Sequence, residues 1–355
     1  MLQFTFSFHR SYKRVYVWSM KFGNSHCSNV EAPTHLSYLT MSISAVLALL
    51  TISGNMLVLI VLVRNRNNRP CREKRTPLTL LLANLAVTDV IAGGITLPFS
   101  LFNHYQEALK QPKYLKVPLQ FFFFYLSIVS VSCLAAITLD RYFAVSRPFW
   151  HRVNATPKRV IAISVVIWLF SSVLVSSYFE VGFIIFSFVF CNTSVTFTIF
   201  IFFFTYGRSL KKLNMSMFVA DRATGQHVGS SSRTMSQIVV RREKKLTKAF
   251  LLMLLLFLSC YFPAAVFIYL MNFCFTCSCV TIHWFRDLQF WFVMASSAMN
   301  PFVYAFRFPS IRRSVTELLT ITGRRNRIAP TVGSTTRGRL QVAWSTTQDH
   351  IQEHY

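Results

Sequence analysis

The stretch VPLQFFFFYLSIVSVSCLAAITLDRYFAV, residues 117–145, has the length and composition of a helix that crosses a lipid bilayer. An α-helix needs about 20 predominantly apolar residues to span the hydrocarbon core. The only charged residues of this stretch, Asp140 and Arg141, come near its carboxyl end. A charge at the membrane is costly unless it has a partner or a function. We therefore predict a transmembrane helix over Val117–Val145 with two candidate functional residues near its end.

Six further apolar stretches of similar length occur along the chain, namely Leu36–Val63, Pro77–Leu101, Val160–Phe179, Val181–Tyr206, Lys248–Met271 and His283–Phe306. Hydrophobic residues form 53% of the sequence and charged residues 14%, which is outside the usual range for a soluble domain. Strands of a membrane barrel would be shorter and would alternate in polarity, and the run Phe121–Phe124 does not alternate. We predict an all-α membrane protein, with a seven-transmembrane helix bundle over residues 36–306.

The basic residues are distributed unevenly between the two sides of this bundle. If the amino terminus is outside, 29 of the 37 Lys and Arg residues fall on the inner side. The positive-inside rule then places the carboxyl terminus in the cytosol and residues 1–35 outside. Topology accounts for the net charge of +25, so nucleic acid, the usual partner of a strongly basic chain, is not expected.

Asp89 lies in the middle of the second predicted span, and an ionisable residue there is a functional candidate. It needs a cation, a proton or several hydrogen-bond donors. Polar residues on other spans are available as partners: Asn55, Ser130, Ser296, Ser297 and Asn300. Oxygen ligands around one carboxylate suit a small hard cation such as sodium. A protonated Asp89 in a structural hydrogen-bond network is the alternative.

Pro263 and Pro301 lie within the sixth and seventh spans. Proline removes a backbone hydrogen bond and kinks a helix. Proline is also common in membrane helices without a special role. Two kinks near the middle of adjacent spans are alternatively suited to act as hinges in a bundle that opens at one end.

One motif on each span, taken in order, gives a specific resemblance. Over about Leu36–Leu319 the chain resembles a rhodopsin-like (class A) G-protein-coupled receptor. The motifs are Gly54-Asn55, Leu82–Ala86 with Asp89, Asp140-Arg141-Tyr142, Trp168, Tyr206, Phe257 with Cys260–Pro263, and Asn300–Tyr304. The resemblance implies a plasma-membrane receptor and not an enzyme. It implies that an extracellular ligand drives outward movement of the sixth helix and activation of a heterotrimeric G protein.

The resemblance also implies roles for particular residues. Arg141 would pair with Asp140 and with Glu243, although Glu243 is alternatively one more solvated charge in a basic run. The implied activation and G-protein-coupling residues are Asp140, Arg141, Tyr142, Pro148, Phe149, Tyr206, Glu243, Phe257, Tyr261, Pro263, Asn300, Pro301 and Tyr304. The implied pocket for an allosteric sodium ion consists of Asn55, Asp89, Ser130, Ser297 and Asn300.

Several positions depart from the common pattern of the family. Tyr261 stands where most members have tryptophan, and Thr198 where the fifth helix usually has proline. Lys116 replaces the cysteine at the top of the third helix, and only Tyr178–Gly182 separate the fourth and fifth spans. The usual disulfide between that loop and the third helix cannot form. This combination is similar to the branch that holds melanocortin, lysophospholipid, cannabinoid and adenosine receptors.

Four cysteines belong to the expected outer side: Cys27, Cys274, Cys277 and Cys279. In an oxidising exterior they can form disulfides in three ways, and a zinc site is the alternative. The Cys-x-Cys spacing resembles the melanocortin-receptor arrangement, which implies the pairs Cys274–Cys277 and Cys27–Cys279.

The outer half of the bundle is the expected ligand site. By position its lining includes Phe99, Leu119, Gln120, Phe123, Phe124, Ser127, Phe190, Ala264, Ala265, Ile268 and Phe290. Phe123 stands where amine receptors carry an aspartate, so a biogenic amine is not expected. The expected pocket is apolar and lies below a basic rim formed by Lys110, Lys113, Lys116 and Arg286, which suits an amphiphilic lipid with an anionic head. A peptide ligand is the other candidate. For the phenylalanines, plain packing in the core is the alternative to ligand binding.

The remaining segments follow from the same resemblance. Residues 307–319 are expected to form an amphipathic eighth helix on membrane lipid, and residues 320–355 a cytoplasmic tail. Serines and threonines in the tail are expected substrates of a receptor kinase, with arrestin as the phosphate-dependent partner. A constitutively active or ligand-silent receptor is an alternative function, and a transporter or channel is a more distant one because no internal repeat is evident.

Overall fold

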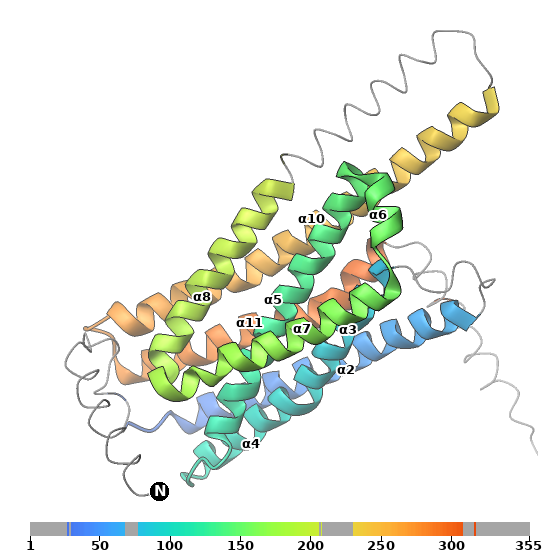
Figure 1. The fold of residues 1–355 in the computed structure, drawn as a ribbon. Helices are drawn as coiled ribbons and strands as arrows, with labels where there is room; N and C mark the ends of the chain where they lie inside the picture. Colours follow the sequence, from blue (N-terminus) through green and yellow to red (C-terminus); the bar gives the residue numbers. More distant parts are fainter. Residues whose placement is uncertain are drawn as a thin grey trace, which may run out of the picture. The chain divides into compact units, whose positions relative to one another are not determined.

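The computed structural model describes Cys27, residues 30–67, 77–205 and 230–307, Gly207 and Thr316. The chain divides into two units, Met1–Val315 and Thr316–Tyr355, and every helix discussed below belongs to the first. In Figure 1 the long helices of this unit lie side by side along a shared direction. No strand occurs in the described ranges, as expected for a polypeptide that must satisfy its backbone within lipid.

The helical elements follow one another without intervening sheet. They are α2 (Thr34–Asn67), α3 (Pro77–Ile91), the π-helical turn η4 (Ala92–Thr96), α4 (Leu97–Ala108), α5 (Lys116–Ser146), α6 (Pro148–Asn154), α7 (Pro157–Ser176), α8 (Tyr178–Thr205), α10 (Ser230–Phe273) and α11 (Cys279–Arg307). Pro263 and Pro301 both lie inside continuous helices. The short α6 is not a span; it forms the connection between α5 and α7.

Six helices are long and apolar enough to cross a membrane: Thr34–Arg64, Pro77–Ala108, Lys116–Ser146, Pro157–Ser176, Ile185–Thr205 and Lys248–Phe273. The seventh, α11, is long enough but carries Arg286 and Asp287 in its outer half. The predicted seven-helix bundle is thus present. The second span was predicted to end at Leu101, and this was wrong, because α4 continues to Ala108. The extra turns hold charged residues whose cost is offset by partners on other helices, as described below.

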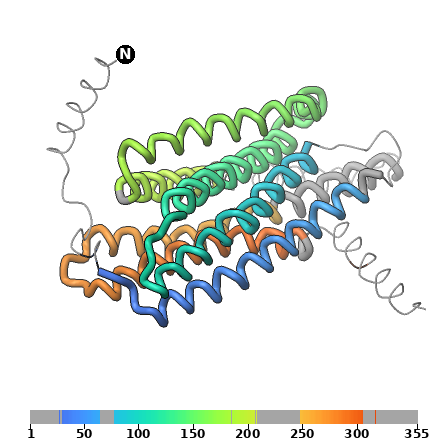
Figure 2. The backbone as a smooth tube through the Cα atoms, turned by 90° about the horizontal axis from the view of Figure 1, so that it is seen from below, coloured from blue at the N-terminus to red at the C-terminus, as the bar shows by residue number. Residues whose placement is uncertain are grey.

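The order of packing places sequence-distant helices side by side (Figure 2). α2 packs against α3, α4 and α11, while α10 packs against α8 and α11. Gly54 permits one of these close approaches, since an added Cβ would lie 2.9 Å from Cγ of Pro301. α7 contributes little to the core: Val166, Leu169 and Val173 are all more than 60% exposed. Such apolar outer faces are suited to contact lipid, because a membrane helix need not bury them in protein.

The connection between α7 and α8 is a tight turn. Only Ser177 separates the two helices, and a kink follows at Gly182, where φ is 78° and ψ is 171°. This left-handed region is open to glycine at little cost and is unfavourable for other residues. The predicted near-absence of an outer loop between the fourth and fifth spans agrees with this geometry.

Candidate functional site

At the expected inner end of α5, Arg141 is buried and its guanidinium turns back on the preceding residue. Its Nε donates to Oδ2 of Asp140 over 3.0 Å, and Nη2 donates to the same oxygen over 2.5 Å. The other carboxylate oxygen, Oδ1, lies 2.7 Å from Nε2 of His151 on α6. Asp140 thus links α5 to the short inner helix and holds the Arg141 side chain along α5.

The residues around this pair differ in exposure. Tyr142 packs against Phe204 of α8, with ring centroids 5.0 Å apart. Pro148 begins α6, and Phe149 is 88% exposed, which leaves an apolar side chain free to be covered by a partner. The expected partners Tyr206 and Glu243 lie outside the residues whose side chains are described, so the Arg141–Glu243 pairing stays a prediction.

The polar core of the bundle is built around Asp89, which is fully buried on α3. Asn300 Nδ2 on α11 donates to Asp89 Oδ2 over 2.7 Å, and Ser297 also interacts with this carboxylate. Asn55 Nδ2 on α2 donates to the backbone oxygen of Ser297 over 3.1 Å. Ser130 is buried on α5, but no hydrogen bond joins it to Asp89 among the described side chains. Four of the five expected residues are therefore brought together.

This core has the donor chemistry that a small cation requires. Asp89 Oδ1 and Asn55 Oδ1 are both buried without a hydrogen-bond partner among the residues that the structure describes. Buried acceptors in this condition are uncommon, and oxygen is the ligand type that hard cations prefer. The residues present therefore fit a sodium ion. In the described part of the chain, no cluster of three His, Cys, Asp or Glu side chains could hold another metal.

Two aromatic side chains, Phe257 and Tyr261, lie on the membrane-spanning part of α10. The rings of Phe257 and Tyr261 are stacked, with centroids 3.9 Å apart. Tyr261 is 1% exposed, interacts with Ser127 of α5 and packs against Phe190 of α8. A small cavity between α10 and α11 is lined in part by Phe257 and Asn300. The tyrosine that replaces the usual tryptophan is thus a fully packed member of the core.

The aromatic residues expected in the outer half of the bundle pack against one another. Phe123 on α5 packs against Phe290 on α11, with centroids 5.4 Å apart. Phe124 packs against Phe190 over 5.7 Å and is fully buried. Gln120 accepts a hydrogen bond of 2.5 Å from the hydroxyl of Tyr178. Of the other expected positions, Phe99 lies on α4, Leu119 and Ser127 lie on α5, and Ala264, Ala265 and buried Ile268 lie on α10.

A charged cluster at this outer end was not predicted. Glu107 on α4 is 5% exposed and receives two hydrogen bonds of 3.1 Å from the guanidinium of Arg286 on α11. Lys113 donates to the same carboxylate. Arg286 Nε also donates to Asp287 over 2.7 Å. His104 Nδ1 lies 2.9 Å from Glu107, and its Nε2 lies 3.9 Å from Asp287.

The cluster corrects one expectation about the pocket. Lys110, Lys113, Lys116 and Arg286 were expected to form a basic rim above the pocket. Instead Lys113 and Arg286 bind Glu107, and Lys110 pairs with Glu31 over 3.6 Å. Of the four, Lys116 is the one without a carboxylate within 4 Å in the described ranges. The physical reason is that charges at a partly buried helix end are stable only when paired.

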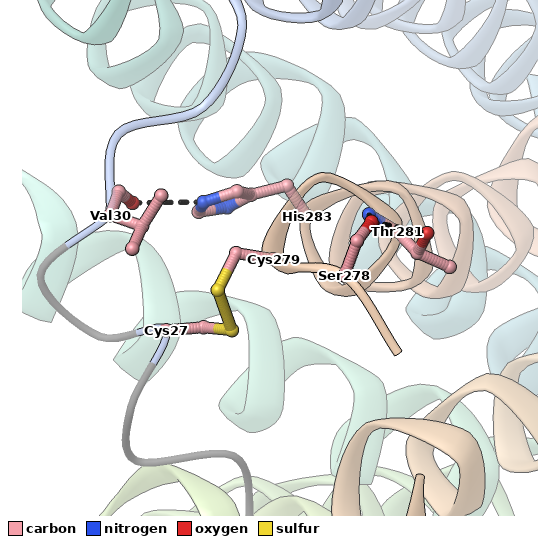
Figure 3. The surroundings of a disulfide bond; sticks show 6 residues. All are labelled: Cys27, Val30, Ser278, Cys279, Thr281 and His283. Carbon is pink, nitrogen blue, oxygen red and sulfur yellow. Dashed lines mark hydrogen bonds between the residues drawn. A yellow bond between two sulfur atoms is a disulfide. The ribbon is translucent and has the colours of Figure 1, made fainter. Parts of the chain in front are cut away.

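Two disulfides join the outer segments, and Figure 3 shows the one between Cys27 and Cys279. Cys27 is bonded to Cys279 at the start of α11, and Cys274 is bonded to Cys277 in the preceding loop. This is the pairing that the resemblance implied. The nearby ring of His283 hydrogen-bonds the backbone oxygen of Val30 over 2.9 Å. The segment before α2 is therefore fastened to α11 by a covalent bond and a hydrogen bond.

Comparison with protein families agrees with these features. A family model described as 7 transmembrane receptor (rhodopsin family) matches residues 54–304. The chain belongs to this family. A rhodopsin-family protein is a multi-pass membrane receptor that signals through G proteins, and it is not an enzyme.

Curated relatives match a shorter region. The alpha-2B adrenergic receptor of Talpa europaea is 35% identical over 133 residues, which cover 36% of this chain and 31% of the relative. The alpha-2Da adrenergic receptor of Danio rerio is 30% identical over 144 residues, or 39% of this chain and 32% of the relative. The alpha-2B adrenergic receptor of Erinaceus europaeus is 33% identical over 133 residues, with 36% and 31% covered. The chain thus matches about a third of the length of these relatives.

Sequence reasoning missed His151, Glu107 and Asp287. The sequence did hold a signal for the two acidic residues, because the chain has only 12 acidic residues in all. Glu107 and Asp287 come close to the outer ends of two predicted spans, where an acidic residue requires a partner. His151 gave a weaker signal, since a histidine in an inner loop is usually solvated.

Proposed function

We propose that this chain is a plasma-membrane receptor with its amino terminus outside, and that an extracellular ligand drives its inner end open. Ligand binding in the outer half would move the inner part of α10 outward. Arg141, freed from Asp140, would then form the floor of a G-protein cavity with Tyr206 and Tyr304. The buried Asp140–Arg141 pair is the observation that carries the proposal, because breaking it exposes a guanidinium at the inner face.

The exposed Phe149 supplies a second contact for the same partner. An aromatic side chain that is mostly free in the receptor gains from burial against a G protein, at about 25 cal/mol per Å² of apolar surface. The tail would add regulation. Its serines and threonines are proposed substrates of a receptor kinase, and phosphate there would recruit arrestin.

A sodium ion held by Asp89 would favour the inactive arrangement. Its ligands would come from Asp89, Asn55, Ser297 and Asn300, with Ser130 on the facing helix. The ion would supply positive charge to a buried carboxylate. The direct Asn300–Asp89 hydrogen bond ties α11 to α3, so any movement of α11 would disturb the same oxygen set.

The ligand is proposed to be an amphiphilic lipid or a peptide. The ligand class of the adrenergic relatives is not proposed for this chain, because Phe123 places an apolar ring where a cationic amine would need a carboxylate. The acidic side chains of the outer end, Glu107 and Asp287, are already bound to Arg286. The short α7–α8 connection and the outer disulfides support placement in the branch that includes melanocortin receptors.

A receptor with constitutive output, or one silent without its ligand, is the second candidate. It is favoured by Tyr261, whose stacked and buried ring replaces the usual tryptophan, and by Thr198 in place of proline. Both substitutions alter the helices whose movement would carry the signal.

Nucleotide exchange tests the proposal. Membranes that carry the full chain are incubated with purified Gα subunits of each class, and binding of radiolabelled GTPγS is measured without added ligand. We expect nucleotide exchange on at least one class of Gα. Arg141→Ala should abolish this exchange, and Lys158→Ala, a control at an exposed residue on the expected inner side, should retain it. Exchange unchanged in Arg141→Ala would contradict the proposal. No exchange in any variant would favour the ligand-silent candidate.

A further inference from the structure

The loop between α10 and α11 carries a disulfide that differs from the one fastening the amino-terminal segment. Cys274 and Cys277 are bonded to each other at a sequence separation of 3, whereas the separation of Cys27 and Cys279 is 252. Residues 274–278 form neither helix nor strand. The short bond therefore lies in irregular backbone, while Cys279 belongs to the first turn of a helix.

The two bonds also differ in exposure. Cys27 is 4% exposed, so one end of its bond is shielded from solvent. Cys274 and Cys277 are half-buried, and between them Phe275 is 70% exposed and Thr276 is exposed. Thiol–disulfide exchange requires a thiolate to reach a sulfur atom, so its rate depends on access, and exposed disulfides are the more easily reduced ones. The loop bond is therefore the more open of the two to an external thiol.

A second contact protects the bond of the amino-terminal segment. The ring of His283 on α11 hydrogen-bonds the backbone oxygen of Val30 over 2.9 Å, close to Cys27 (Figure 3). This contact holds the segment against α11 independently of the disulfide. If the Cys27–Cys279 bond opened, its two thiols would stay near each other and the bond would re-form.

The ends of the two helices make the two sulfur atoms of the loop bond unequal. Cys274 directly follows the carboxyl end of α10. Cys277 lies just before the amino end of α11, where Oγ of Ser278 accepts a hydrogen bond of 3.2 Å from the backbone nitrogen of Thr281. The amino end of a helix carries partial positive charge and the carboxyl end partial negative charge, and a thiolate is favoured near an amino end. Cys277 is therefore the better leaving group, which directs attack to Cys274.

We propose that the Cys274–Cys277 bond is a redox modification site that a dithiol reductant opens, while Cys27–Cys279 stays closed. One thiolate of the reductant attacks Sγ of Cys274, the disulfide breaks, and Cys277 leaves as a thiolate that takes a proton from water. The second thiolate of the reductant then attacks the mixed disulfide and releases Cys274, which is protonated in turn. Two electrons pass to the protein, the reductant becomes a disulfide, and the two protons that it gives to water equal those that the cysteines gain.

The short spacing explains why the reductant needs two thiols. After attack by a monothiol, Cys277 remains three positions from the mixed disulfide on Cys274 and can attack it, which restores the loop bond. The second thiol of a dithiol competes with this closure. Opening the bond frees the connection between α10 and α11, which pack against each other. The modification thus acts on the helix whose movement is proposed to carry the signal, but its chemistry does not depend on that function.

Mass spectrometry of the purified full chain in maltoside micelles tests the site. Free thiols are first blocked with N-ethylmaleimide. The chain is then incubated with dithiothreitol below its unfolding transition, alkylated with iodoacetamide at increasing times, and fragmented to assign each alkylated cysteine. We expect Cys274 and Cys277 to be alkylated at least about ten times faster than Cys27 and Cys279, because exchange follows access. Glutathione at an equal concentration of thiol groups should leave the loop bond closed.

Two further measurements assign the order of attack and the independence of the two bonds. A thioredoxin whose second active-site cysteine is replaced by serine cannot complete the reaction, so we expect it to stay bonded to Cys274 and to leave Cys277 as a free thiol. The control variant Cys274→Ser with Cys277→Ser lacks the loop bond. In this variant Cys27 and Cys279 should remain unalkylated under the same conditions.

Several outcomes would overturn the proposal. They are equal rates of alkylation at the two pairs, faster opening of Cys27–Cys279, or no opening of the loop bond until the chain unfolds. A thioredoxin adduct on Cys277 would overturn the assigned order of attack, and equal opening by glutathione would overturn the need for a dithiol. None of these measurements uses a G protein, so their results are independent of the nucleotide-exchange test.

Discussion

Nε2 of His151 lies 2.7 Å from Oδ1 of Asp140, on the carboxylate oxygen that Arg141 does not use. One carboxylate is therefore held from two sides, by its neighbour on α5 and by the connecting helix α6. Because both contacts orient Asp140 toward Arg141, loss of either one weakens the closed arrangement.

His151→Phe is expected to raise ligand-independent nucleotide exchange. The substitution keeps an aromatic ring but removes a hydrogen bond to a charged group, worth about 1.5–3 kcal/mol, so basal exchange should rise several-fold. Initial rates of GTPγS binding in membranes measure it. Arg152→Gln, an exposed neighbour on α6, serves as the control and should match wild type. A rate at or below wild type in His151→Phe would show that the contact does not restrain Arg141.

Glu107→Gln is expected to lower stability strongly. Arg286, whose side chain is partly exposed, would lose the bidentate carboxylate and keep Asp287 as an acidic partner. Hydrogen bonds to charged groups contribute about 1.5–3 kcal/mol each. The unfolding midpoint of the purified chain reports the loss. The double variant Glu107→Gln with Arg286→Met removes both charges and should recover much of it. If the single and double variants unfold at the same temperature, the ion pair does not carry the effect.

Asp89→Asn is expected to abolish a stabilising effect of sodium. In wild type, replacing choline chloride with sodium chloride should raise the unfolding midpoint, because the ion would coordinate the buried, unpartnered Asp89 Oδ1 and Asn55 Oδ1. Choline is too large for this core and keeps the ionic strength constant. The variant lacks the formal charge and should unfold at the same temperature in both salts. A wild-type chain that is equally stable in both salts would count against a sodium site.

Gly54→Ala is expected to destabilise the bundle, by about 1–3 kcal/mol as in other overpacked sites. The new Cβ would lie 2.9 Å from Cγ and 3.1 Å from Cβ of Pro301, so α2 and α11 must separate. Gly94→Ala is the matched control, since nothing lies within 4 Å of its added Cβ. The control should be neutral or slightly stabilising, because alanine restricts the unfolded chain. Equal midpoints for the two variants would argue against the close approach.

Removal of the Cys27–Cys279 disulfide is expected to cost more than removal of Cys274–Cys277. The first bond closes a loop between residues 252 apart and the second between residues 3 apart. In the chain-entropy account, a longer loop restricts the unfolded state more. The comparison uses the thermal unfolding midpoints of two double variants, Cys27→Ser with Cys279→Ser and Cys274→Ser with Cys277→Ser. The reverse order would mean that the short loop shapes the top of α11 by itself.

Much of the site depended on tertiary structure for its details. The sequence predicted that Asp89, Asn300 and Ser297 form one polar core, because polar side chains inside apolar spans need hydrogen-bond partners on neighbouring helices. It did not predict that the buried amide of Asn103 on α4 would have no hydrogen-bond partner among the described residues, since the rotation of α4 about its own axis decides which face reaches the interior. A span that is apolar on most sides gives only weak information about that rotation.

The sequence by itself determined the number of spans and the family, because each follows from a local property: the length of an apolar run, or a short motif in its place along the chain. Tertiary structure alone decided that Glu107 would meet Arg286 across 179 residues, and that His151 would meet Asp140. Both pairings depend on the rotation and vertical register of separate helices. Those are fixed by the packing of many side chains together and not by any one segment.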